Sequence, residues 1–258
     1  MSRVCMFCQR EGQRLTREHV YPNWLSKLFS TKLKVTSEVS GDSIKRTWQS
    51  NIFQDKIKLV CGECNSGWMS TIESEVKGLL TSLAFTHDGH TLIQEDQRKL
   101  SLWVQKTVLV INKATGGDFD IPIGFYEKLY KSQSQPISNM MVTMGWRMLA
   151  KGTKDEPLAT FEIKQVSRAI PNDKKSAAAI KLQVAEGKLI WAATLGLGNV
   201  VFQIVGTNLD GKIEVGGNDS HVRVFPQINT YSEDLEWPTE WPIEALGKLE
   251  DIKKGLYG

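Results

Sequence analysis

The sequence predicts an α+β protein with two domains, and three observations favour this fold class. Two C-x-x-C pairs bracket the first 64 residues, which indicates a small metal-braced domain at the N-terminus. Apolar residues recur at helical spacing between residues 68 and 113. Several segments that favour β structure follow residue 140, with turn residues between them, and their close spacing predicts a mainly antiparallel sheet. We therefore expect a zinc-binding domain over 1–83 and an α+β domain over 84–258.

Composition is that of an ordinary globular protein. The chain has 258 residues, 41% of them hydrophobic and 24% charged, which is enough for a sizeable core and excludes disordered and fibrous classes. The formal net charge is +3, and residues 1–80 hold 12 Lys and Arg against 8 Asp and Glu. This excess fits contact with phosphate, but it is also within the normal scatter of charge along a chain.

The N-terminal sequence shows no apolar segment of the length that a signal peptide needs, and no run of the chain has the length of a membrane span. We therefore expect a cytoplasmic protein that has no membrane partner and whose cysteines are reduced.

The cysteines form two C-x-x-C pairs with none left over: Cys5, Cys8, Cys61 and Cys64. A C-x-x-C turn places two thiolates on one side of a knuckle, and two such knuckles supply the tetrahedral set that Zn²⁺ prefers. The alternative is two disulfides or redox pairs. A reducing compartment and the lack of a βαβ context around either pair argue against it. We expect a structural zinc with no open coordination position, whose binding helps this segment to fold.

Glu18 and His19 follow the first knuckle, and Asn65 directly follows the second. A zinc bound by both knuckles would staple the ends of the intervening segment together and let these three side chains converge. Neighbouring residues of a strand point to opposite faces, so a functional Glu-His pair predicts an irregular or bulged backbone at this point.

The order C-x-x-C, Glu-His-Val-x-Pro and C-x-x-C-Asn resembles the HNH endonuclease family. The layout is similar to the zinc-containing type represented by endonuclease VII, and to uncharacterised bacterial HNH proteins that share runs like REHVYPNWL and VCGECNSGWM. The resemblance covers roughly residues 1–80 and implies a ββα-metal fold for the N-terminal domain.

The resemblance also implies a function, which is metal-dependent hydrolysis of phosphodiester bonds in nucleic acid. Glu18 and Asn65 would bind a catalytic Mg²⁺ or Mn²⁺, whose preference for oxygen ligands they meet. His19 would be the general base that activates water. Double-stranded DNA is the expected substrate and antiphage defence the expected context. Cutting both strands would favour a homodimer.

Basic side chains surround the Glu-His pair. Those expected to contact phosphates are Arg10, Arg14, Arg17 and Lys27. The alternative is an ordinary solvated face.

The sequence departs from the HNH pattern at two places. The middle Asn of the family has no counterpart, because Asp55 or Lys56 stands at its position. Asn51, Asp55 or a backbone carbonyl would have to orient His19 instead. The residue one turn after the last Asn is neither acidic nor His. Glu73 is the nearest carboxylate on this helix, and we expect it to be an exposed charge, with a place at the edge of the site as the alternative.

The rest of the chain predicts helices and then strands. The expected helices are 68–83, 94–113, 124–133 and 174–187, and the first of them is expected to begin close to Asn65. Within 94–113, a core-facing side is predicted at Leu100, Trp103, Val104, Thr107, Val108 and Ile111. The expected strands are 140–150, 158–166, 188–197, 199–206, 211–215 and 221–228.

Two other functions stay open on the sequence alone. The chain could be a zinc-ribbon module that binds nucleic acid without catalysis, which the missing middle Asn would permit. It could also sense a ligand or bind another protein through the C-terminal domain.

Overall fold

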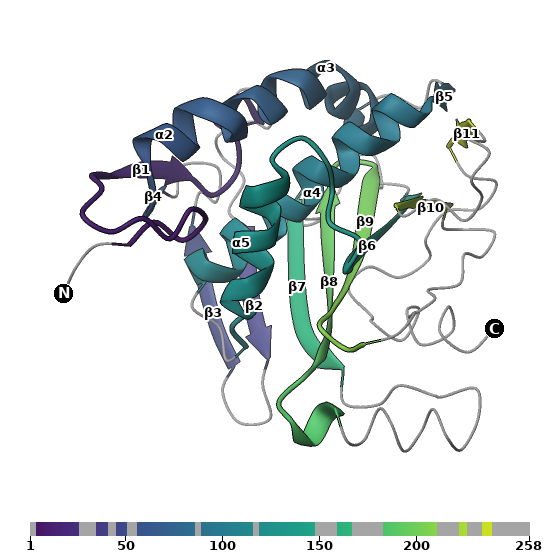
Figure 1. Cartoon of the computed structure of the whole chain (residues 1–258). Coiled ribbons are helices and arrows are strands. Elements are labelled where there is room, and N and C mark those ends of the chain that lie inside the picture. Colours follow the sequence, from purple (N-terminus) through teal and green to yellow (C-terminus); the bar gives the residue numbers. More distant parts are fainter. Residues whose placement is uncertain are drawn as a thin grey trace.

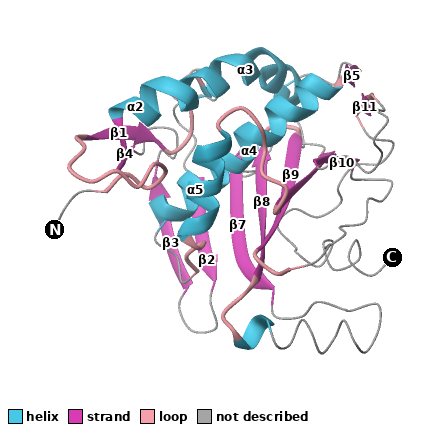
Figure 2. Ribbon diagram, viewed as in Figure 1, coloured by secondary structure: helices cyan, strands magenta, loops and turns pink. Residues whose placement is uncertain are grey.

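The computed structural model describes residues 4–25, 35–40, 45–50, 56–85, 89–115, 119–147, 159–166, 183–210, 222–225 and 234–238. These residues form an α+β fold in which every sheet is antiparallel, as the sequence predicts (Figures 1 and 2). The helical elements are α2 (Gly62–Cys64), a π-helical stretch η1 (Asn65–Met69), α3 (Ser70–Phe85), α4 (Gln94–Thr115) and α5 (Ile123–Ser132). The strands are β1 (Leu15–His19), β2 (Val35–Ser40), β3 (Lys45–Ser50), β4 (Lys56–Cys61), β5 (His90–Leu92), β6 (Met140–Trp146), β7 (Ala159–Val166), β8 (Ile190–Leu197), β9 (Val200–Thr207), β10 (Val222–Phe225) and β11 (Leu235–Trp237).

The N-terminal part has the order strand, strand, helix. β1 pairs with β4, and a helical run from Gly62 to Phe85 follows β4 directly. Residues of β4 alternate between exposed Lys and more buried Ile and Leu, which is the pattern of a strand with one solvated face. The hairpin of β2 and β3 is inserted between the two paired strands and lies beside β7 (Figure 1). The sequence did not predict this hairpin.

The helical run after β4 is irregular near its start. It begins at Gly62, close to the start near Asn65 that the sequence predicts, and Asn65 is the first residue of its π-helical stretch. Gly67 has non-helical dihedral angles (φ −90°, ψ −117°), so the π-helical stretch is kinked. Such stretches are rare and concentrate at functional sites.

The central sheet has the strand order β10-β6-β9-β8-β7. β8 and β9 form a hairpin through Gly198 and Asn199, and all residues of both strands are buried. Gly198 has φ +53°, and a Cβ there would lie 2.2 Å from the carbonyl oxygen of Ala84. Only glycine lets this turn approach the end of α3, where the Asn199 amide donates to Ala84 at 2.8 Å.

Helices α4 and α5 cover one face of this sheet. The ring of Trp103 packs on Phe202, and that of Phe125 packs on Trp191, with centroids 6.4 and 5.6 Å apart. All six positions of α4 that the sequence assigned to the core are buried. Residues 101–112 are in fact all buried, because α3 packs against α4 in addition to the strands of the sheet.

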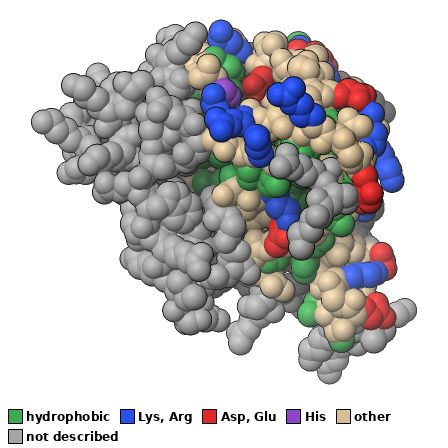
Figure 3. All heavy atoms as spheres, turned by 90° about the vertical axis from the view of Figure 1, so that its left-hand side faces the viewer, with side chains coloured by type: hydrophobic (Ala, Val, Ile, Leu, Met, Phe, Trp, Pro, Cys, Tyr) green, Lys and Arg blue, Asp and Glu red, His purple; other side chains and the backbone are tan. Residues whose placement is uncertain are grey.

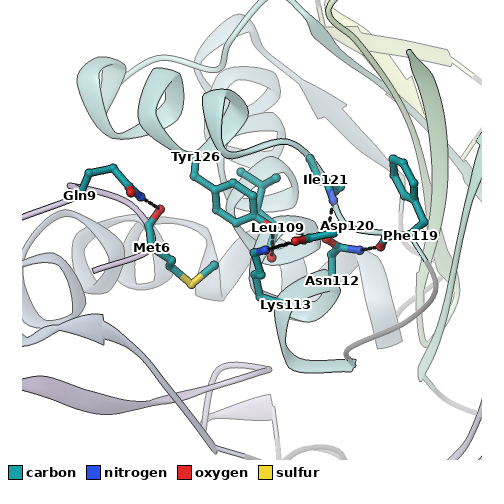
Figure 4. A network of polar contacts seen from close by, with 9 residues as sticks. All are labelled: Met6, Gln9, Leu109, Asn112, Lys113, Phe119, Asp120, Ile121 and Tyr126. Carbon is teal, nitrogen blue, oxygen red and sulfur yellow. Dashed lines mark hydrogen bonds and ion pairs between the residues drawn. The ribbon is translucent and has the colours of Figure 1, made fainter. Parts of the chain in front are cut away.

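A polar network joins the last turns of α4 to residues 119–121, which lead into α5 (Figure 4). Asn112 donates from Nδ2 to the Phe119 carbonyl at 2.8 Å and accepts from the Ile121 amide at 3.0 Å. The hydroxyl of Tyr126 donates to the Leu109 carbonyl at 3.1 Å. The Tyr126 ring also contacts the ring of Phe7, with centroids 5.6 Å apart, so the first knuckle packs on this corner.

One continuous cluster of buried side chains therefore runs from the N-terminal knuckle through α4 to the sheet. A domain boundary after residue 83 stays a prediction, and the two predicted domains share this core.

The predicted strands 140–150, 158–166, 188–197, 199–206 and 221–228 correspond to β6 to β10. Strand 211–215 and most of helix 174–187 lie outside the described residues.

None of the described helices has the length and apolar character needed to cross a bilayer.

Candidate functional site

The four cysteines meet at one point. Their sulfur atoms all lie within 4.8 Å of one another, and no disulfide joins them. Cys8 Sγ and Cys61 Sγ are 3.8 Å apart, whereas a disulfide would need about 2.05 Å. A tetrahedral ion with metal–sulfur distances of about 2.3 Å would hold its sulfurs about 3.8 Å apart. The cluster could therefore hold a metal such as zinc, and it was the group that the C-x-x-C spacing predicted.

Local hydrogen bonds shape the first knuckle. Gln9 has φ +54°, and its Nε2 donates to the carbonyls of Cys5 at 3.1 Å and Met6 at 2.7 Å, the second of which is drawn in Figure 4. The Met6 amide donates to the Leu59 carbonyl at 2.8 Å, which attaches the knuckle to β4. The two cysteine pairs are thus brought together by the strand that precedes the second pair.

The polar groups around the sulfurs favour thiolates. The Cys61 amide donates to Cys5 Sγ at 3.3 Å, and Arg10 Nε donates to Cys8 Sγ at 3.4 Å. The hydrogen bond from Cys64 lowers the pKa of Cys5, while the pKa of Cys64 is raised by the same contact. Metal-bound cysteines are deprotonated, and a divalent cation is what would let all four ionise.

Glu18 and His19 lie at the end of β1, next to an irregularity in the strand pairing. Thr16 pairs with Val60 but Glu18 pairs with Ile57, so the register shifts between Thr16 and Glu18. The sequence predicted an irregular backbone near this pair, and the shift lies just before it. Glu18 is 5% exposed, whereas His19 is half-buried.

Glu18 is a buried residue, and its carboxyl group has no partner among the described residues. No hydrogen bond or ion pair joins it to any of them, although Lys106 and Glu73 lie within electrostatic range. Burial raises the pKa of Glu18 to about 7, an effect that Lys106 opposes and Glu73 increases. A carboxylate in this environment is well suited to receive a cation, since a cation would replace its lost hydration.

The surroundings of His19 disfavour its charged form. Its pKa is lowered, mainly by burial and also by Lys56, which lies directly opposite His19 in the strand pairing. Glu73 acts in the other direction. A neutral imidazole at physiological pH can accept a proton.

Asn65 is the first residue of η1, within the helical run that starts at Gly62, and it lies against β1. Its Nδ2 donates to Thr16 Oγ1 at 3.0 Å, and Thr16 Oγ1 donates to the Val60 carbonyl at 3.0 Å. Thr16 is two residues before Glu18, a separation of about 7 Å along a strand. The contact uses the amide nitrogen of Asn65, and the oxygen is the atom that a hard cation would bind.

Glu73 was named from the sequence with the edge of the site as the alternative, whereas Lys106 was not recognised. Glu73 was expected to be an exposed charge, but its Oε1 accepts from Lys106 Nζ at 2.7 Å. Its side chain is only 20% exposed, and that of Lys106 is fully buried. Lys106 lies in the apolar run of α4, and the one available signal was a lysine within a helix that is otherwise suited to burial.

The sequence predicted that Asn51, Asp55 or a backbone carbonyl orients His19. Asn51 and Asp55 both lie outside the described residues. Lys56, which with Asp55 was one of the two residues expected at the position of the middle Asn in the HNH pattern, pairs with His19 across the two strands.

The basic residues near the site differ in their surroundings. Arg14 and Arg17 are exposed, as are Lys56 and Lys58 on β4. Arg10 is exposed but forms an ion pair of 2.6 Å with Glu63 in addition to its contact with Cys8. Lys27 lies outside the described residues. Figure 3 views the side of the molecule where β1, β4 and α2 lie, and its upper part shows Lys and Arg side chains beside a histidine.

Comparison of the chain with protein-family models, with curated proteins and with solved structures gave no match.

Proposed function

We propose that this protein is a metal-dependent endonuclease that hydrolyses phosphodiester bonds in nucleic acid, with DNA as the main substrate. The observation that carries the proposal is the buried residue Glu18, whose carboxyl group has no partner among the described residues. Glu18 is next to His19 in β1, and the surroundings of His19 disfavour its charged form. The cysteine cluster and the hydrogen bond from Asn65 to Thr16 hold β1 beside the helical run that contains Asn65. The order of β1, β4 and the helix supports it, since it is the order of a ββα-metal fold.

In this proposal each residue has a separate role. The Glu18 carboxylate and the Asn65 amide oxygen would hold Mg²⁺ or Mn²⁺, and the remaining coordination positions would be open to water and phosphate oxygens. When bound, that ion supplies stabilisation of negative charge on the phosphate and the leaving oxygen. His19 accepts a proton from the attacking water.

The cysteine cluster has a structural role. A zinc bound to four thiolates has no open position for substrate, so it would brace β1 and β4 without taking part in the reaction. Exposed basic side chains on or beside the same two strands, Arg14, Arg17, Lys56 and Lys58, would contact phosphates.

The test is nicking of supercoiled plasmid with Mg²⁺ or Mn²⁺ by the wild type, His19→Ala and His90→Ala. We expect nicking by the wild type and by the control His90→Ala, whose histidine lies in β5 and contacts Ser82. We expect a loss of at least about 100-fold in His19→Ala at unchanged circular dichroism. Equal nicking by His19→Ala and the wild type would refute the proposal.

Gel retardation of DNA by the same proteins, measured beside nicking, separates the two alternatives. A binding module without catalysis would retard DNA in a gel equally well with either residue at position 19, and would not cleave it. A protein that senses a ligand through its C-terminal part would show neither behaviour until that ligand is added.

A further inference from the structure

Lys106 and Glu73 form an ion pair between α4 and α3 inside the protein. Lys106 Nζ lies 2.7 Å from Glu73 Oε1, and the lysine side chain has no exposed surface. A buried ammonium group that lost this carboxylate would remain uncompensated in a poorly solvated place. The lysine and the carboxylate therefore hold each other in position.

This ion pair belongs to the surroundings of the proposed cation site. Lys106 and Glu73 both act electrostatically on Glu18, and Glu73 also acts on His19. Lys56 acts on His19 as well, but it is exposed, and its charge is screened by water and salt. The charges that a bound cation would experience most strongly are thus those of Glu18, Glu73 and Lys106.

The formal charges of these three groups have a consequence for binding. In the form that binds a cation, Glu18 is ionised, and two carboxylates and one ammonium then leave one negative charge. A divalent cation would turn this into one positive charge, which the single negative charge of a phosphodiester would neutralise. Without Lys106, the two carboxylates would carry two negative charges. The divalent cation alone would neutralise them, without a phosphodiester.

We infer that Lys106 is a positioning residue that weakens binding of a divalent cation by the free protein and makes tight binding depend on a phosphodiester. The inference rests on the proposed function. It assigns to α4, which lies beyond the predicted N-terminal domain, a direct part in the site.

The competing explanation is an ion pair that only holds α3 and α4 together. Removing either partner would then lower the free energy of unfolding but would leave cation affinity unchanged. Cation affinity measured on folded protein separates the two explanations.

The experiment measures Mn²⁺ binding by electron paramagnetic resonance on the zinc-loaded full chain. All proteins carry His19→Ala to prevent cleavage, and a DNA duplex is either absent or saturating. Without DNA, we expect Lys106→Met to bind Mn²⁺ about tenfold more tightly than the parent and Glu73→Gln about tenfold more weakly. We expect DNA to increase the affinity of the parent far more than that of Lys106→Met.

The double variant Glu73→Gln with Lys106→Met is the matched control. It removes both charges and leaves the net charge of the site unchanged, so we expect its Mn²⁺ affinity to return to within about threefold of the parent. It replaces the whole pair by neutral groups, so it also remains testable if a single variant fails to fold. Affinities of the folded variants that all match the parent would overturn the inference, as would a double variant that shows the loss of Glu73→Gln.

Failure of the proposed function has a different signature. In that case the parent would bind no Mn²⁺ with or without DNA, or Glu18→Gln would bind it as well as the parent. Failure of the inference alone would leave binding that depends on Glu18 but not on Lys106.

Discussion

Cys8 Sγ and Cys61 Sγ lie 3.8 Å apart although 53 positions separate them in the chain. We predict that the purified protein contains about one zinc per chain, since four thiolates form a closed tetrahedral site. Because binding energy at such a site is folding energy, removal of the ion should lower the melting temperature. Elemental analysis and thermal unfolding before and after chelation check both points. Zinc-free protein with an unchanged melting temperature would contradict the prediction.

Cys8→Ser should reproduce the effect of the chelator. Ser66→Ala is the control, because Ser66 follows the second knuckle and its hydroxyl donates to the Gly62 carbonyl rather than to a sulfur. We expect Ser66→Ala to keep its zinc.

Glu18 should make stability depend on pH in an unusual direction. Its pKa is raised from 4.5 to about 7, so its contribution to the free energy of unfolding is fully present below about pH 4.5 and is lost as the pH rises through 7. Above pH 7, the ionised buried carboxylate should lower that free energy by roughly 3 kcal/mol. Glu18→Gln should therefore be more stable than the wild type at pH 8 and equally stable at pH 4. Urea unfolding at the two pH values measures this.

The effect of Mg²⁺ on stability provides a second test of the role of Glu18. At pH 8, saturating Mg²⁺ should stabilise the wild type and leave Glu18→Gln unaffected, because a ligand stabilises only the form that binds it. Glu75→Gln, at an exposed position of α3, should behave like the wild type throughout. Equal stabilisation of Glu18→Gln by Mg²⁺ would place the cation elsewhere.

His19 is expected to titrate below its ordinary pKa of 6.5, since burial and Lys56 both disfavour its charged form. Lys56→Gln should raise the pKa of His19, and Glu73→Gln should lower it further. The control Lys58→Gln changes a charge on the same strand that is not among the causes of this shift, and it should leave the pKa of His19 unchanged. Only four histidines contribute to the spectrum, so a proton–carbon NMR titration can follow each of them. A pKa of His19 above 6.5 would contradict its partly buried position opposite Lys56.

Features that depend on residues close together in the sequence were predictable, whereas features that depend on contacts between distant residues were not. The cysteine cluster was predictable because C-x-x-C spacing and zinc chemistry are local rules, and the core positions of α4 were predictable from the period of 3.6 residues. Lys106 was not, because its partner Glu73 is 33 residues away and no local pattern pairs them. The periodicity suggested a helix with one core face, whereas residues 101–112 of α4 are all buried, and contacts with α3 contribute to this burial.

Gly198 should tolerate no side chain, because two separate effects act at this turn. Its φ of +53° disfavours any residue with a Cβ, and that Cβ would also meet the Ala84 carbonyl at 2.2 Å. The control Gly187→Ala has φ +83° with no described heavy atom within 4 Å, so it carries only the conformational effect. We expect Gly187→Ala to lower the free energy of unfolding by about 1 kcal/mol and Gly198→Ala by about 3 kcal/mol. Similar values for the two variants in urea unfolding would mean that the turn moves away from α3 without penalty. In that case the contact between Asn199 and Ala84 would not hold α3, the helix that carries Glu73, against the sheet.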